Sequence, residues 1–185
     1  SALLALSMMF VITACGDKDK DSSKDSKAQT SKAETSSTTT DNDKAEIKST
    51  GPNGETAVNA NNLSLTDEEI EKIKSGNYTA AICLHYGGND WSASQVKGLT
   101  DTFNKLGIKV VATTDANFSA EQQVADIETV MALKPDILIS IPTDAVATAD
   151  AYQRAADAGI RIVFMDNVPQ GFKAGKNYVS CVSAD

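Results

Sequence analysis

The stretch YTAAICLHY, residues 78–86, decides the fold class of this chain. Its middle is continuously apolar from Ala80 to Leu84, whereas a strand with one face in water alternates apolar and polar residues. A strand that is apolar on both faces is typical of a parallel sheet with helices on both sides. The stretch therefore predicts a strand buried on both faces of such a sheet.

The segments on either side of this strand have helical spacing. In residues 92–106 the apolar side chains fall on one helical face, and Gly107 follows as the stop. Residues 63–76 predict a shorter helix, opened by a capping box of Thr66 and Glu69. The predicted strand is thus preceded and followed by a helix.

Strands and helices continue to alternate along the chain. Two further helices are predicted, one from Ser119 with Gln122 in its capping box and one from about Asp144 to Ala158. Alternation with short connections predicts an α/β fold with a doubly wound parallel sheet and right-handed crossovers. The remaining strands are predicted at residues 108–113, 135–141, 160–166 and 178–185.

The first residues predict an export signal. The apolar stretch 2–14 has the length of a signal-peptide core and is too short to span a bilayer. The residues from Ile12 to Cys15 resemble the bacterial lipobox, so we expect residues 1–14 to be a lipoprotein signal peptide that lacks its basic start, and Cys15 to carry the lipid. The alternative is an ordinary secretory signal in which Cys15 is incidental.

Residues 15–62 have the composition of a solvated spacer, with alternating Asp and Lys followed by Ser/Thr runs. Too few apolar side chains are present to offset the loss of chain entropy on folding, so the stretch predicts a disordered linker. The sequence therefore predicts three parts: the signal peptide, the lipidated linker and a folded domain at residues 63–185.

Charge and cysteine content exclude several classes of function. The formal net charge is −8 with lysines interleaved, so no basic stripe is present and nucleic acid is excluded as a partner. Cys15, Cys83 and Cys181 lack the spacing of a zinc site or of a disulfide framework, so no metal or cofactor is predicted. Cys83 and Cys181 lie in apolar runs, and we expect them to be buried as small hydrophobic residues.

The loops after the strands are the expected place of a binding site, because doubly wound sheets bind ligands at the carboxyl ends of their strands. Gly87 and Gly88 precede a helix, but neither a dinucleotide fingerprint nor a Walker lysine is present, which excludes nucleotide binding there. His85 is the one histidine, and without a recognisable partner it is expected to line the cleft rather than to catalyse. The four loops are residues 85–91, 113–119, 141–144 and 165–169.

From Asn77 to Asp185 the domain resembles the N-terminal lobe of type I periplasmic binding proteins, the ribose-binding family. The resemblance rests on four motifs in order: Asn89 and Trp91 in the first loop, IPTD at 141–144, MDN at 165–167 and VSAD at 182–185. It implies a non-enzymatic, extracytoplasmic receptor of an ABC importer. Such a receptor binds a sugar or polyol between two lobes and delivers it to a membrane permease, and this chain would hold one lobe.

The resemblance also implies roles for particular residues. Trp91 would stack on the apolar face of a sugar ring, while the Asn89 amide and the Asp166 carboxylate would bind its hydroxyl groups. Asn167 stands where the ribose-binding protein has arginine, and Asp90 where it has proline, which argues against ribose and for another neutral sugar or polyol. The expected ligand-binding residues are His85, Tyr86, Asn89, Asp90, Trp91, Asp166 and Asn167.

Each of these residues also has a purely structural interpretation. Trp91 could pack against its own helix, Asn89 could cap that helix, and Asp166 could form a turn. Asp144 is expected to be the N-cap of its helix rather than a ligand residue.

Alternatives for the whole chain are a nucleoside or signalling-sugar receptor lipoprotein and a flavodoxin-like flavoprotein. A lactose-repressor-type regulator would need a helix-turn-helix where the lipobox stands.

Overall fold

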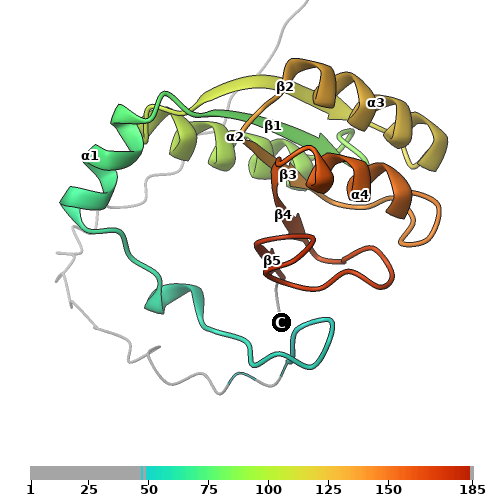
Figure 1. Cartoon of the computed structure of the whole chain (residues 1–185), viewed down its shortest axis with the longest axis horizontal. Helices are drawn as coiled ribbons and strands as arrows, with labels where there is room; N and C mark the ends of the chain where they lie inside the picture. Colours follow the sequence, from blue (N-terminus) through green and yellow to red (C-terminus); the bar gives the residue numbers. More distant parts are fainter. Residues whose placement is uncertain (1–46, 48, 184–185) are drawn as a thin grey trace, which may run out of the picture. The chain divides into compact units, whose positions relative to one another are not determined.

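The computed structural model describes residue 47 and residues 49–183 of the chain. The lipid site at Cys15, the signal peptide at 1–14, most of the predicted linker and the last two residues lie outside this part. Five strands form one sheet in the order β2-β1-β3-β4-β5, and every pair is parallel (Figure 1). The predicted doubly wound parallel sheet is confirmed. The strands are β1 Thr79–Leu84, β2 Lys109–Asp115, β3 Ile137–Ser140, β4 Arg161–Met165 and β5 Ser180–Val182.

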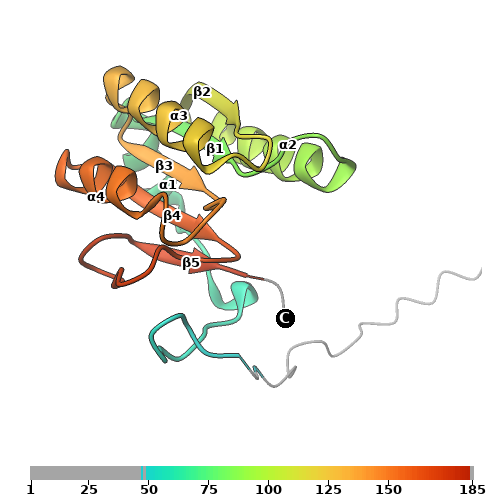
Figure 2. The ribbon, with the colours of Figure 1, turned by 90° about the vertical axis from the view of Figure 1, so that its right-hand side faces the viewer.

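Helices cover both faces of this sheet. In Figures 1 and 2, α3 and α4 lie together over one face, and the apolar side of α2 packs on the other. Ile73 of α1 joins the second of these layers. The helices are α1 Asp67–Ser75, α2 Asp90–Lys105, α3 Ala120–Leu133 and α4 Ala149–Asp157, with a 3-10 turn η1 at Ala60–Asn62 before them.

Strand β1 is buried on both faces, as its apolar run predicted. Ala81 and Cys83 pack in the cluster under α3 and α4, whereas Ile82 and Leu84 pack in the cluster under α2. Cys83 is fully buried, Cys181 is half-buried and both are free thiols, so burial is confirmed for the first and partial for the second. The sheet is therefore the shared wall of two hydrophobic layers.

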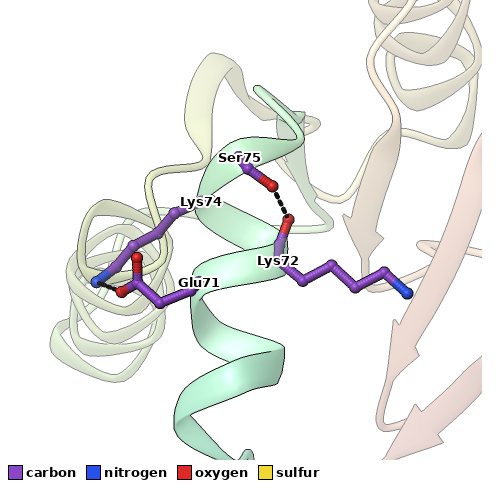
Figure 3. Close-up of polar contacts among 4 residues, drawn as sticks. All are labelled: Glu71, Lys72, Lys74 and Ser75. Atoms are coloured by element: carbon purple, nitrogen blue, oxygen red, sulfur yellow. Dashed lines mark hydrogen bonds and ion pairs between the residues drawn. The ribbon is translucent and has the colours of Figure 1, made fainter.

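Helix α1 begins with the predicted capping box. The Thr66 amide donates to Glu69 Oε2 at 2.8 Å, and the Glu69 amide donates to Thr66 Oγ1 at 3.3 Å. Farther along, Lys74 pairs with Glu71 at 2.8 Å, and Ser75 Oγ donates to the Lys72 carbonyl at 2.8 Å (Figure 3). These exposed polar contacts stay within one or two turns of the helix, so Ile73 alone links α1 to the apolar layer.

The start of α3 differs from the prediction in one detail. Ser119 is the N-cap, and its side chain accepts a hydrogen bond from the Gln122 amide at 3.1 Å, as predicted. The return bond of a capping box is missing, because Gln122 Nε2 donates instead to Asp126 one turn later, at 2.8 Å. Asp126 thus binds the Gln122 side chain that would otherwise have completed the capping box.

The start of α4 was placed too early. The helix begins at Ala149 with Thr148 as N-cap, and Asp144 is not its cap. The Asp144 carboxylate accepts hydrogen bonds from the amides of Val146 and Ala147, at 2.8 and 2.7 Å, and so caps a separate turn before the helix. These two amide donors hold the pKa of Asp144 below its usual range.

Residues 50–62, inside the predicted linker, carry local hydrogen-bonded structure. Thr50 and Thr56 form an antiparallel bridge around a turn, and Asn53 Nδ2 donates to the Phe172 carbonyl at 3.0 Å. Polar contacts rather than apolar burial hold this segment.

Among the residues that the structure describes, no helix is both long enough and apolar enough to cross a membrane.

Candidate functional site

The carboxyl ends of the strands carry the predicted site. In the order β2-β1-β3-β4-β5, the chain runs from β1 outward to β2 and then returns to the other side of β1 for β3. The loops after β1 and β3 therefore lead away in opposite directions, and the gap between them is the switch point at which such sheets bind ligands. All seven residues predicted to bind a ligand lie in the loops after β1 and β4 or at the first turn of α2.

The loop after β1 leads directly into α2 through Asn89. Its Oδ1 accepts a hydrogen bond from the Ser92 amide at 2.8 Å, so the helix-cap interpretation of Asn89 is confirmed. The side-chain Nδ2 takes no part in that bond, and its contact with a ligand stays a prediction. Asp90 and Trp91 form the first turn of α2, and Trp91 is 47% exposed. A side chain this exposed is only partly used for packing, and its contact with a ligand stays a prediction.

Gly87 and Gly88 stand where the loop after β1 approaches two side chains closely. A Cβ atom on Gly88 would lie 2.4 Å from Tyr86 Oη, and one on Gly87 would lie 2.8 Å from Asp115 Oδ2. The Tyr86 carbonyl in turn accepts a hydrogen bond from the buried Ser92 Oγ at 2.7 Å. Gly88 thus leaves room for the Tyr86 side chain, and Gly87 leaves room for the Asp115 carboxylate at the end of β2.

Phe118, in the loop after β2, is a neighbour of this site that the sequence did not identify. Its amide donates to the His85 carbonyl at 2.7 Å, and its ring stacks on Tyr86 with centroids 4.5 Å apart and planes 13° apart. The His85 ring meets it edge-on at 5.3 Å. The signal in the sequence was an aromatic residue in an otherwise polar loop.

Gln123 is a second residue that the sequence reasoning missed. It is fully buried in α3, where its Nε2 donates to the Ile141 carbonyl at 2.8 Å and its Oε1 accepts from the Thr143 amide at 2.6 Å. These two hydrogen bonds therefore fix the loop after β3 to α3. The signal was a polar residue in line with Ile127 and Val130 on the buried face of the helix.

Asp166 and Asn167 follow β4 directly. Asp166 is exposed and has a φ of 63°, a left-handed conformation that is uncommon outside glycine, and its amide donates to the Val182 carbonyl at 2.9 Å. Asn167 Nδ2 donates to the Pro142 carbonyl at 3.3 Å. Aspartate tolerates this conformation, which here directs the chain out of β4 with the carboxylate exposed.

The structure joins the loops in two pairs. The loops after β1 and β2 meet through the contacts of Phe118 with His85 and Tyr86, and the loops after β3 and β4 meet through Asn167 and Pro142. The hydrogen bonds and ring contacts of the described part of the chain do not join Trp91 to Asp166. The predicted residues thus share one edge of the sheet but form two groups.

A groove of about 590 Å³ runs beside this edge, between α2 and β2. None of the seven predicted ligand-binding residues lines it, because it opens along the flank of the sheet rather than at the switch point. It is lined by Leu84, Gly87, Ser92, Ala93, Val96, Lys97, Thr100, Asp101, Thr113, Thr114 and Asp115.

Neither metal binding nor thiol chemistry is indicated at this edge. Within the described residues, no three His, Cys, Asp or Glu side chains are grouped so that they could hold a metal ion. Burial raises the pKa of the Cys83 thiol to about 11, so it stays protonated and a poor nucleophile at neutral pH.

The family described as periplasmic binding protein domain matches residues 64–185. A search of curated proteins gives no match.

Several solved structures resemble the chain. LsrB from Clostridium saccharobutylicum in complex with AI-2 is 28% identical, with a TM-score of 0.50 over 57% of this chain and 31% of that one. The Caulobacter myo-inositol binding protein is 24% identical, with a TM-score of 0.51 over 59% of this chain and 36% of that one. An ABC transporter solute-binding protein from Agrobacterium vitis, bound with α-D-tagatopyranose, is 23% identical, with a TM-score of 0.52 over 58% of this chain and 38% of that one.

At 23% and 24% identity, the last two matches show a shared fold. The chain spans about a third of the length of these structures, since it covers 31%, 36% and 38% of them. The family match extends over almost all of the described domain, and it gives no support to the flavodoxin-like alternative. The chain belongs to the periplasmic binding protein domain family, a family of solute-binding proteins rather than of enzymes.

Proposed function

We propose that this chain is the N-terminal lobe of an extracytoplasmic solute-binding protein of an ABC importer, and that its ligand is a neutral sugar or polyol. The observation that carries the proposal is the set of exposed aromatic and polar side chains at the carboxyl edge of a lobe of this family. Trp91 and Asp166 are the principal members of that set, and both are exposed.

The chemistry of these side chains suits a sugar. A sugar ring has apolar C–H faces that an indole can cover and a rim of hydroxyl groups that need hydrogen-bond partners. The Asp166 carboxylate can accept two hydroxyl protons at once, and the Nδ2 of Asn89 can donate to a hydroxyl oxygen. The loop after β4 also lacks a cation beside Asp166, since Asn167 follows it, which favours an uncharged ligand.

The proposed receptor has a second lobe. The chain spans about a third of the structures it resembles, and Trp91 and Asp166 at the proposed edge are exposed. A second lobe that closes over this edge by a hinge motion would complete the cleft and present the loaded receptor to a membrane permease. We therefore expect the lobe alone, residues 63–185, to bind sugar weakly or not at all.

Anchoring of this receptor to the membrane is part of the proposal. The lipobox-like stretch that ends at Cys15 supports a signal peptide at 1–14 and a lipid on that cysteine. Because one acyl chain holds only reversibly, the several chains of a bacterial lipoprotein give a stable anchor. Mass spectrometry of the mature N-terminus, from cells that carry either natural Cys15 or Cys15→Ser, would show the lipid mass in the first case only. An unmodified cysteine would refute the anchor and leave the binding function untouched.

The binding function is tested on the full-length gene product by isothermal titration calorimetry. The panel comprises D-allose, myo-inositol, L-rhamnose and AI-2, which are bound in structures that resemble this chain. We expect micromolar affinity for at least one of them, about −8 kcal/mol of binding free energy. A protein that binds none of them contradicts the proposal.

Variants at the edge sharpen this test. Trp91→Ala removes the stacking surface, and Asp166→Asn removes the charge while keeping the shape, so we expect each to weaken binding at least tenfold. Asp157→Asn, at the other end of α4, is the matched control and should leave the affinity unchanged. Equal affinity in all three variants would mean that this edge does not touch the ligand.

A further inference from the structure

Phe118 is a large apolar residue that is exposed to solvent. The residue is 62% exposed, whereas Ala116 in the same loop is buried. Leu133 and Val146 are similarly exposed apolar residues, but Phe118 is held by a main-chain hydrogen bond to His85 and by a stacked ring, that of Tyr86. Its outer face is thus presented to solvent in a fixed orientation.

The backbone at this position is strained. Asn117 has a φ of 47° and Phe118 a φ of 59°, and two successive residues in the left-handed region are unusual. Asparagine tolerates this region, whereas a bulky aromatic residue there is a true outlier. Glycine at position 118 would keep the hydrogen bond to the His85 carbonyl without the strain. The aromatic ring, rather than the loop conformation, is therefore what phenylalanine contributes.

The ring lies beside the proposed site. Tyr86 and His85, which it touches, follow β1 at the switch point, and the Asp115 carboxylate sits at the base of the same loop, where it accepts a hydrogen bond from the Asn117 amide at 2.8 Å. Asp115 is exposed. An aromatic side chain and a carboxylate carried by one loop are the two kinds of group that bind a sugar ring, an apolar plane and a hydroxyl acceptor.

We propose that Phe118, supported from behind by Tyr86, is a ligand-stacking residue that extends the sugar site onto the loop after β2. This inference rests on the proposed sugar-binding function and adds to it a second aromatic surface besides Trp91. The stacked pair fixes the Phe118 ring before the ligand arrives, so little side-chain entropy is lost on binding.

The test uses the full-length protein and calorimetric titration with D-allose, myo-inositol and L-rhamnose. Phe118→Gly should weaken binding at least tenfold while the melting temperature stays the same or rises, because glycine relieves the left-handed strain. Phe118→Tyr should keep the affinity within about threefold, since a second aromatic ring can stack in the same way. Leu133→Ala removes an equally exposed side chain from α3 and should leave the affinity unchanged.

Several results would overturn the inference. If Phe118→Gly binds the sugar as tightly as the natural protein, the ring does not touch the ligand. If it binds normally but fails to deliver sugar to membranes that carry the permease, the ring docks a protein partner instead. If Phe118→Gly melts lower and Phe118→Tyr loses binding, the ring supports the loop only. Absence of sugar binding by the unmodified protein would overturn the proposed function, and with it this inference.

Discussion

Replacement of Gln123 by methionine removes a buried polar clamp from beneath the loop after β3. In the natural chain its amide group binds both the Ile141 carbonyl and the Thr143 amide. Methionine has nearly the same length and packs well among apolar neighbours, but it cannot replace either hydrogen bond. The substitution therefore leaves two main-chain groups unpaired while the volume of the core stays almost constant.

The expected loss of stability follows from the burial of those two groups. A buried polar group without a partner costs about 1–3 kcal/mol. Ile141 is 2% exposed, so the cost of its unpaired carbonyl is expected at the upper end of this range. Thr143 is half-buried, so water can reach its unpaired amide and the cost is expected at the lower end. The sum is about 3–4 kcal/mol, a large part of the roughly 5–15 kcal/mol that stabilises a typical domain. At about 2–8 °C per kcal/mol, the melting temperature should fall by at least about 6 °C.

Urea unfolding of the whole chain, followed by far-ultraviolet circular dichroism, measures this difference. Gln122→Met is the matched control, because Gln122 is exposed and its side chain binds only Asp126 on the same helix. We expect the control to change the unfolding free energy by no more than about 0.5 kcal/mol. If Gln123→Met is less than about 1 kcal/mol below the control, the clamp does not stabilise the loop and the reasoning fails.

Gln123→Glu gives the same argument a dependence on pH. An ionised glutamate could accept from the Thr143 amide, but it would face the Ile141 carbonyl oxygen and be buried, so its folded pKa should rise above the unfolded value of about 4.3. Relative to the natural protein, the variant is then most stable below about pH 4.3, where the protonated acid can donate to the Ile141 carbonyl. It loses this relative stability as the pH rises through the raised folded pKa. A flat difference from the natural protein between about pH 4 and pH 7 would contradict this.

Two further predictions concern single side chains. Burial raises the pKa of both described thiols. In the native protein at pH 8 we therefore expect fully buried Cys83 to stay unlabelled by iodoacetamide and half-buried Cys181 to react slowly. Peptide mass spectrometry measures both, with urea-unfolded protein as the control, and labelling of native Cys83 would show that β1 opens. The Asp144 carboxylate has a lowered pKa from the Val146 and Ala147 amides, so its contribution to stability is present above its unfolded pKa and is lost as the pH falls through the lower folded pKa. In urea unfolding, Asp144→Ala should therefore destabilise the chain at pH 7 and progressively less as the pH is lowered, and an effect that does not depend on pH would mean that the charge is not what caps the turn.

The sheet could be predicted because its signal is local. Five apolar runs with helical stretches between them determine a parallel α/β sheet, and β1 has the continuous burial that its composition implies. The bounds of α4 could not be read in this way. Asp144 is a good capping residue, but it caps a turn and not the helix, and only the hydrogen bonds to Val146 and Ala147 distinguish these two roles.

The candidate site was predictable only in part, for a related reason. Its expected position at the strand ends follows from the alternation of strands and helices, and the capping role of Asn89 could be recognised from the sequence. Phe118 and Gln123 act through loops that are distant in the sequence, at Tyr86 and at Thr143, and no spacing rule connects these pairs. Tertiary contacts between loops determine these roles. The sequence showed only that an aromatic residue lies in a polar loop and that a glutamine lies on the apolar face of a helix.

The pairing of the loops has a consequence for how this family member could change its ligand. The loops after β1 and β2 are held to each other by Phe118, and the loops after β3 and β4 by Asn167. Gln123 of α3 bonds the loop after β3, and no described hydrogen bond joins the loop at residues 85–89 to the loop at residues 141–148. Substitutions within one pair can therefore alter one side of a bound molecule while the other pair keeps its shape. If the proposed site binds the ligand, we expect changes on its two sides to affect the binding free energy additively.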